Sequence, residues 1–347
     1  MNPVGWGFIG TSGILRRRWL PAFKTTSRAV PLSVGSRTLP RAEAVASEFG
    51  IPRAVGSYEQ VLEDPGIDAV YIGLPNTMHA AWILRALEAG KPVLCDKPMT
   101  VTADEAATVL DASRSTGLPV MEGLMYRFHP QNAHVREVIR SGAIGSVREV
   151  RVHNALRLMD DIRPDNIRLT DGAGAGALMD MGPYVISATR MLFDSEPISA
   201  IGRWDMHGTL GVDVGFAGVL EYSDTRFAPI SWSFRTGNGG GYVVVGSEAM
   251  LEVPRAFIPG AAGQVEETIA ITVDKTSQRF ETPFAPANQY ALAIDEFSTA
   301  VAEGRRPLYD ADDAYRQARA MDLVRDTQEA ASVPDADETV GSERAGP

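Results

Sequence analysis

Apolar and polar segments alternate regularly over the first 125 residues of the chain. Short apolar runs occupy 4–9, 29–36, 68–75, 92–95 and 118–123. Runs that are apolar at consecutive positions are typical of strands buried on both faces. Polar segments with helical spacing separate them, so the order strand–helix–strand predicts a parallel, doubly wound sheet.

The segments between these runs carry helix start and stop signals. Helices are expected from the first turn to about Ser27, over 39–50, from 78 to Gly90, and over 102–117. The last of them opens on Thr-x-x-Glu, the spacing of a capping box. Gly90 fits the left-handed residue that commonly ends a helix.

The hydrophobic pattern changes after about residue 145. Between 146 and 285, apolar and polar residues alternate in several segments, which predicts an antiparallel sheet with one wetter face. One strong helical pattern interrupts it over 175–192. Two further helices, over 287–303 and 310–329, are expected to close the fold.

Composition narrows the class of partner. The chain has 44 acidic and 33 basic residues, a formal charge of −11, so it has no general attraction for nucleic acid or anionic lipid. No apolar run approaches the roughly 18–20 residues of a membrane span. The single cysteine, Cys95, forms no internal disulfide and fits a reducing compartment. We therefore predict a cytoplasmic protein that binds a small molecule, and neither nucleic acid nor membrane.

The first strand-to-helix turn reads Gly10-Thr11-Ser12-Gly13, followed by Ile14. Glycines there permit a tight turn and let backbone N–H groups approach a pyrophosphate at a helix N-terminus. Ser12 stands where a second glycine is usual, and an ordinary turn is the alternative. The position, at the first βα junction of an alternating array, favours a dinucleotide site lined by these five residues.

The end of the second strand bears on the choice of cofactor. NAD-binding domains usually carry an acid there for the ribose 2′-hydroxyl, but this chain has Ser36 and Arg37. A hydroxyl and a guanidinium suit a 2′-phosphate, because Arg makes forked, charge-assisted hydrogen bonds. NADP(H) is therefore favoured over NAD(H). The alternative is that Arg37 only flanks a helix on the surface.

Five motifs, taken in order, resemble a known family. They are the turn at 10–13, "PNTMH" at 75–79, "CDKP" at 95–98, "EGLMYRFHP" at 122–130 and "GAGAGALMDMGPY" at 172–184. Together they are similar to the Gfo/Idh/MocA oxidoreductases, named for glucose-fructose oxidoreductase and inositol dehydrogenase. The "DMGPY" form resembles the NADP-linked sugar dehydrogenases, dihydrodiol dehydrogenases and keto-sugar reductases of that family.

The resemblance spans about residues 4–330 and implies a domain organisation. An NADP(H)-binding Rossmann domain is expected over 1–125. An α/β domain with a large, open, mainly antiparallel sheet, which binds substrate, is expected over 126–330. In the family that sheet commonly forms oligomer contacts, so a homodimer or homotetramer is predicted. Residues 331–347 are polar and are expected to form a loose tail.

The resemblance also assigns residues to the active site. The family has a Glu-Lys-Pro motif whose lysine lies in that site; here it reads Asp96-Lys97-Pro98, with an acid one methylene shorter. Lys97 is therefore a candidate for both catalysis and substrate binding. The remaining candidates for lining the cofactor are Leu74, Pro75, Asn76, His79, Asp96, Lys97, Pro98 and Arg127. His79 has a second interpretation as the cap of its own helix, and Arg127 as part of a surface ion pair.

An enzyme that interconverts an alcohol and a carbonyl must move the hydroxyl proton. Tyr184 is the candidate, and an ammonium group at Lys97 is expected to lower its pKa from about 10. Asp180 lies four residues earlier, on the same helical face, where it can bond a substrate hydroxyl or orient Lys97. The alternative is an amphipathic helix with a paired aspartate and a packed tyrosine.

The remaining candidates for substrate contact are Tyr126, Asn166 and Arg168. No metal site is predicted, because the histidines lack the spacing of a ligand pair and no His-Glu-x-x-His occurs. Cys95 is interpreted as a small core residue.

The resemblance and the residues together predict an NADP(H)-dependent oxidoreductase that interconverts a hydroxyl and a carbonyl or lactone on a sugar or polyol. An aldose dehydrogenase is favoured, with a nucleotide-linked keto-sugar reductase or a trans-dihydrodiol dehydrogenase as alternatives. A non-catalytic NADP(H)-binding regulator on the same fold is the alternative from another class. The presence of both Lys97 and Tyr184 argues against the regulator, because a binding module needs neither.

Overall fold

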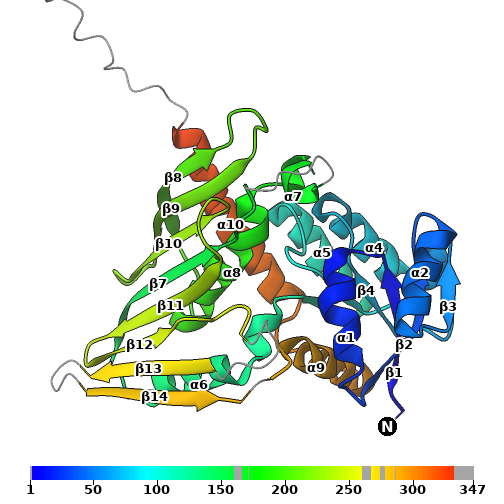
Figure 1. Cartoon of the computed structure of the whole chain (residues 1–347), viewed down its shortest axis with the longest axis horizontal. Coiled ribbons are helices and arrows are strands. Elements are labelled where there is room, and N and C mark those ends of the chain that lie inside the picture. The colour runs from blue at the N-terminus through cyan, green and yellow to red at the C-terminus, as the bar shows by residue number, and fades with distance from the viewer. Residues whose placement is uncertain are drawn as a thin grey trace, which may run out of the picture.

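A computed structural model describes residues 2–159, 166–170, 172–259, 267–273, 278–285 and 287–331; for 267–273, 278–280 and 329–331 it describes the backbone alone. Two sheets lie side by side, each with helices packed on it (Figure 1). The predicted tail lies outside the described residues, apart from Ala331.

The first sheet is the predicted parallel one, and its strand order is β3-β2-β1-β4-β5-β6. Every neighbouring pair is parallel. This confirms the Rossmann-like fold, and the order reverses between β1 and β4, the position where such sheets bind ligands. The strands are β1 (Val4–Ile9), β2 (Ala29–Gly35), β3 (Arg53–Val55), β4 (Ala69–Ile72), β5 (Val93–Cys95) and β6 (Val120–Glu122).

The helices of this half connect successive parallel strands. The first helical segment ends at Phe23, earlier than the expected Ser27, and it begins with a π-helical stretch. Thr102 caps α5 by accepting a hydrogen bond from the backbone N–H of Glu105, as the capping box predicts. The segments are η1 (Leu15–Trp19), α1 (Leu20–Phe23), α2 (Leu39–Phe49), α3 (Glu59–Leu62), η2 (Asn76–Met78), α4 (His79–Glu88) and α5 (Ala103–Thr116).

The second sheet has the order β14-β13-β12-β11-β7-β10-β9-β8. Its neighbours are antiparallel except for the central pair β7 and β10, which is parallel. This confirms the large, mainly antiparallel sheet. Its strands are β7 (Val147–Ala155), β8 (Ser199–Met206), β9 (Asp213–Glu221), β10 (Phe227–Ser233), β11 (Gly239–Gly246), β12 (Ala249–Val253), β13 (Glu267–Val273) and β14 (Gln278–Phe284).

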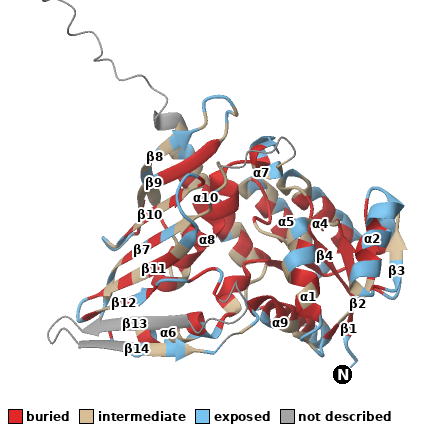
Figure 2. Ribbon diagram, in the orientation of Figure 1, coloured by how far each residue is buried: buried red, intermediate tan, exposed pale blue. Residues whose placement is uncertain are grey.

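Helix α8 packs on β7, β10 and β9 and is buried along almost its whole length (Figure 2). Helix α6 follows the "MYRFHP" motif and begins at Pro130; the hydrophobic pattern did not predict it. The helical segments of this half are η3 (Met125–Phe128), α6 (Pro130–Arg140), α7 (Ile167–Thr170), η4 (Gly172–Gly174), α8 (Ala177–Phe193), α9 (Gln289–Glu303) and α10 (Ala311–Ala331).

Large residues alternate with glycines along β1, and this pattern explains why helix α9 packs against the first sheet. Trp6 packs its ring 5.6 Å from that of Phe297 and donates its indole N–H to Ser298, 3.1 Å away. On the other face a Cβ at Gly7 would lie 2.5 Å from Val61, so a side chain there has no space. Trp6 therefore holds α9 on one face of β1, and Gly7 leaves space for α3 on the other.

Helix α10 contacts both halves of the chain. Asp322 accepts a hydrogen bond from the N–H of Ala103 at the start of α5, and Arg325 donates to the carbonyl of Val101. The same helix packs against β8 of the second sheet. The predicted boundaries of the domains stay a prediction, because α9 and α10 each contact the first domain. No helix among the described residues is long and apolar enough to cross a bilayer.

Candidate active site

The glycine turn after β1 lies against the end of β4. Gly10 has φ +101°, and a Cβ there would lie 2.6 Å from the carbonyl oxygen of Gly73. Only glycine fits both the conformation and the space. Ser12 accepts a hydrogen bond from the N–H of Leu15, 3.3 Å away. The bare backbone of the turn and the following helical segment provide the surface that a dinucleotide pyrophosphate requires.

At the end of β2, Ser36 is buried and Arg37 is exposed. Burial raises the pKa of Tyr58, and the guanidinium groups of Arg37 and Arg41 oppose that shift, so both lie within electrostatic reach of its ring. Arg41, in the first turn of α2, was not predicted, although it lies only four residues after Arg37 in the sequence. Two cations near the end of β2 fit a 2′-phosphate.

Lys97 lies two residues after the end of β5 and points at the start of α8. Its Nζ lies 2.7 Å from Oδ1 of Asp180 and 2.7 Å from the backbone oxygen of the same residue. Arg168 donates from Nε to the other carboxylate oxygen, 2.6 Å away. Burial alone raises the pKa of Asp180, but Lys97 and Arg168 outweigh it and lower the pKa to about 2. Asp180 is therefore an anion held between two cations.

Tyr184 lies one turn after Asp180 on α8. The ammonium of Lys97 lies 5.1 Å from the centre of its ring, and the hydroxyl lies 3.8 Å from the sulfur of Met125. Burial first, and then Tyr290, Asp96 and Asp180, raise the pKa of Tyr184 well above 10. The expected lowering of this pKa is therefore wrong, because burial and the neighbouring groups raise it, and the ammonium of Lys97 is bonded to Asp180. Tyr184 is a neutral phenol in this arrangement.

Asp96, which replaces the glutamate usual in the family, turns back on its own loop. Its Oδ1 accepts a hydrogen bond from the backbone N–H of Lys97, 3.0 Å away. Burial raises the pKa of Asp96, and the charges of Lys97 and His79 oppose the rise. The shorter side chain thus supports the backbone of Lys97.

The loops after β4 and β5 are joined by His79. Its Nδ1 lies 2.8 Å from the carbonyl oxygen of Pro98, and its Nε2 lies 2.9 Å from that of Leu74. Both ring nitrogens are therefore occupied by the backbone. Asn76 donates from Nδ2 to the carbonyl of Gly174, 2.8 Å away, and so joins the first domain to the segment before α8. Pro75 and Pro98 belong to these same two loops.

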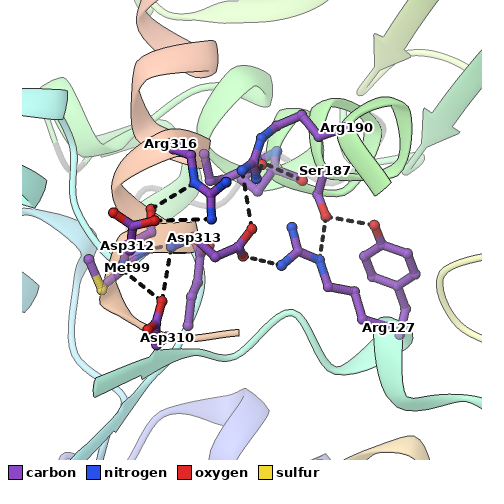
Figure 3. Close-up of polar contacts among 12 residues, drawn as sticks. Met99, Arg127, Ser187, Arg190, Asp310, Asp312, Asp313 and Arg316 are labelled. Carbon is purple, nitrogen blue, oxygen red and sulfur yellow. Dashed lines mark hydrogen bonds and ion pairs between the residues drawn. The ribbon is translucent and has the colours of Figure 1, made fainter. Parts of the chain in front are cut away.

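Tyr126 and Arg127 require a correction. Tyr126 is 0 % exposed, and its hydroxyl lies 2.6 Å from that of Ser187. Arg127 donates to Ser187 and forms an ion pair with Asp313, which also bonds Arg190 (Figure 3). The predicted contacts with substrate and cofactor are replaced by internal contacts, because both side chains turn inward between α8 and α10.

Asn166 acts on its own segment. Its Oδ1 accepts a hydrogen bond from the N–H of Arg168, 3.2 Å away, at the start of α7. The structure thus brings Lys97, Asp180, Arg168 and Tyr184 together. Asn166 does not bond these four side chains in the described residues; it caps the helix that carries Arg168.

Comparison with known proteins assigns the family. Residues 4–124 match the model of the oxidoreductase family with an NAD-binding Rossmann fold, GFO/IDH/MocA, and residues 132–252 match the model of the GFO/IDH/MocA C-terminal domain. The chain is 35% identical over 332 residues to D-xylose 1-dehydrogenase (NADP(+)) 2 of Haloferax volcanii, covering 96% of this chain and 99% of that protein.

Two further relatives agree. The chain is 32% identical over 260 residues to trans-1,2-dihydrobenzene-1,2-diol dehydrogenase of Mus musculus, covering 73% of this chain and 75% of that protein. A crystal structure of a 3-ketoreductase from Actinomadura kijaniata, in complex with NADP and TDP-benzene, is similar with a TM-score of 0.85. Its sequence is 31% identical, and the match covers 94% of this chain and 98% of that chain.

The comparisons decide three of the predictions from sequence. The resemblance to the family is confirmed, and so is the prediction of an oxidoreductase. The prediction of NADP(H) is confirmed as well, because the xylose dehydrogenase is named as an NADP(+) enzyme and the ketoreductase structure holds NADP. With both halves of its length matched, the protein belongs to the GFO/IDH/MocA family of oxidoreductases.

Proposed function

We propose that this protein is an NADP(H)-dependent oxidoreductase that interconverts a hydroxyl and a carbonyl group on a sugar or polyol. The observation that carries the proposal is the group formed by Lys97, Asp180, Arg168 and Tyr184 at the carboxyl end of β5. Ligands bind at this edge in open α/β sheets. A scaffold that only bound the cofactor would have no need to bury such a group.

The cofactor, when bound, gives or accepts a hydride at the substrate carbon. The glycine turn at Gly10 would contact its pyrophosphate through backbone N–H groups. Ser36 and Arg37, with Arg41 nearby, would bind the 2′-phosphate. Ser36 and Arg37 directly follow β2, where an NAD-specific domain would carry an acid, and Arg41 lies in the first turn of α2.

The residues of the chain handle the proton and the charge. Tyr184, a neutral phenol, donates its proton to the substrate oxygen in the direction of reduction. Lys97 and Arg168 carry two positive charges, which are paired with Asp180 and lie within electrostatic reach of Asp96. These two cations favour the negative charge that develops on the substrate oxygen.

An aldose is the favoured substrate, because the Haloferax volcanii xylose dehydrogenase matches over 96% of this chain. A keto-sugar reductase is the second candidate, and a specific observation favours it. The raised pKa of Tyr184 keeps the hydroxyl protonated, which suits a proton donor better than a base.

The test is a measurement of NADPH at 340 nm in both directions, with D-xylose and other aldoses and NADP⁺, and with keto-sugars and NADPH. The variant Y184F should bind NADPH normally and lose more than about 100-fold in kcat, as expected on removing a general acid. The control is Y222F, since Tyr222 is also buried and bonded, to Thr189, but lies just after β9 and away from the site. Equal activity of Y184F and Y222F would refute the role of Tyr184. A wild-type protein that binds NADPH but turns over no substrate would favour the regulator.

We also propose that the protein is cytoplasmic and forms a homodimer or homotetramer through its larger sheet. Ile201 on β8 and Phe227 on β10 are 59% and 43% exposed and occupy the same face by strand register. Exposed apolar side chains on one face suit a contact between copies. Light scattering after size exclusion tests this, and an I201E variant should shift the mass toward the monomer.

A further inference from the structure

One buried carboxylate in the first domain has a role that the proposed chemistry leaves unexplained. Glu122 ends β6 and is 4% exposed. Its Oε1 accepts a hydrogen bond from the backbone N–H of Met99, 2.9 Å away. Its Oε2 has no hydrogen-bond partner in the part of the chain that the structure describes. Burying a carboxyl group costs free energy. Glu122 is buried although it makes only one hydrogen bond to the backbone, so its presence calls for an explanation.

The contact falls on the loop that carries Lys97. Met99 lies two residues after Lys97, and the carbonyl of Pro98 between them is bonded to His79, 2.8 Å away. Asp96 bonds the N–H of Lys97 itself. Three successive backbone groups of this turn are therefore fixed by side chains, and Glu122 supplies the last of these contacts.

The arrangement of the strands explains why Glu122 can reach this loop. Glu122 pairs with Cys95, the last residue of β5, in the parallel ladder. Both strands end at the same edge of the sheet, so the side chain of Glu122 lies beside the turn that leaves β5. Arg127, the nearest candidate for an ion-pair partner, directs its guanidinium to Ser187 and Asp313 instead.

The hydrogen bond does not depend on the charge of the acid. Burial raises the pKa of Glu122 to about 7, against the opposing effects of the Met99 N–H and Arg127. Both the carboxylate and the protonated acid have an oxygen that can accept from the N–H of Met99. The acceptor, rather than the charge, is therefore the property that matters for the loop.

We propose that Glu122 is a positioning residue for Lys97: by fixing the N–H of Met99 it sets the turn that aims the Lys97 ammonium at Asp180. This inference rests on the proposed function, in which Lys97 acts on the reacting groups. Misplacing a catalytic group by about 1 Å can cost about 100-fold in rate, so a contact two residues away is enough to matter.

The experiment compares E122M, which keeps the length of the side chain and removes the acceptor, with E122Q, which keeps an acceptor oxygen. We expect E122M to lose about 100-fold in kcat, with the KM for NADPH changed less than about threefold, because the turn and not the cofactor site is altered. E122Q should stay within about fivefold of the wild type, since its amide oxygen can accept from Met99. If E122M is too unstable to purify, E122D serves, because it withdraws the acceptor by one methylene.

A double-mutant cycle separates positioning from general loss of stability. If Glu122 acts through the contact between Lys97 and Asp180, the effects of E122M and D180N on kcat should not add. The matched control is D68A, which removes another acidic acceptor of a backbone N–H, that of Gly5, at the opposite end of the sheet. D68A should leave kcat within about threefold and add to D180N.

Hydrogen exchange gives a readout that does not need activity. The amide of Met99 should exchange at least about tenfold faster in E122M than in the wild type or E122Q, since its acceptor is lost. Unchanged exchange, a kcat of E122M within threefold of the wild type, or full additivity with D180N would each overturn the proposal. An inactive wild type whose Met99 amide is exposed by E122M would instead refute the proposed function and leave the contact itself established.

Discussion

The carboxylate of Asp180, between Lys97 and Arg168, supports a quantitative prediction about stability. The substitution D180N keeps the size of the side chain and removes its charge. The amide can offer an oxygen to one of the two cations, but its NH₂ group then faces the other. Both cations are partly buried, with Lys97 at 12% and Arg168 at 38% side-chain exposure, so water compensates only in part.

The pKa of Asp180 sets the magnitude. It lies at about 2 against the ordinary 3.8. Each pKa unit corresponds to about 1.4 kcal/mol, so the ionised carboxylate contributes about 2 kcal/mol to the free energy of unfolding. Because the folded pKa is lowered, this contribution is fully present above about pH 5 and is lost as the pH falls through 3.8 toward 2. At pH 3 about half of it should remain.

Urea unfolding, followed by tryptophan fluorescence, measures the difference between D180N and the wild type at pH 7 and pH 3. We expect about 2 kcal/mol at pH 7 and about 1 kcal/mol at pH 3. The control is D205N, because Asp205 pairs with Arg235 at a site where both side chains are nearly half exposed. Such pairs contribute about 0–1 kcal/mol. A D180N effect no larger than that of D205N, or one that grows on acidification, would refute the reasoning.

Three more predictions concern the cofactor site and the packing of α9. R37A should weaken NADPH binding by about 10- to 100-fold, which corresponds to the loss of a charge-assisted hydrogen bond, and NADH binding by less than about threefold. Equal losses of affinity for the two cofactors in fluorescence titrations would exclude a contact with the 2′-phosphate. G10A should abolish NADPH binding in the same titration, because Gly10 has φ +101° and a Cβ would lie 2.6 Å from the oxygen of Gly73. Normal NADPH binding by G10A would show that the turn can adjust. S298A should lower the free energy of unfolding by about 1–3 kcal/mol, because it leaves the buried indole N–H of Trp6 without its acceptor, and urea unfolding that matches the wild type would count against that contact.

The sequence predicted the features that depend on local pattern. Runs of consecutive apolar residues identified the buried strands. The end of the run at β5 predicted that Lys97 lies at the carboxyl edge of the sheet. The spacing of Asp180 and Tyr184 put both on one helical face, as α8 confirms. The helix at Pro130 was missed, because its motif was interpreted for chemistry alone and its start coincides with an irregular turn.

Features that depend on contacts distant in the sequence could not be predicted. The direction of the Tyr126 and Arg127 side chains is set by Ser187 and Asp313, which lie about 60 and 190 residues further along the chain. The raised pKa of Tyr184 likewise depends on its burial and on Tyr290 in α9. Pairing at such separations leaves no periodic signal in a single sequence.

The protonation of Tyr184 and the pairing of Lys97 together limit how the site can move a proton. In the direction of reduction, the phenol starts protonated, and the charge of Arg168 favours the loss of its proton. In the direction of oxidation, the same phenol must first lose its proton against its burial and the charges of Asp96 and Asp180. Oxidation should therefore gain more than reduction from a rise in pH. A comparison of the two pH–rate profiles would show this as a steeper alkaline rise for oxidation, and parallel profiles would mean that Tyr184 does not carry the proton.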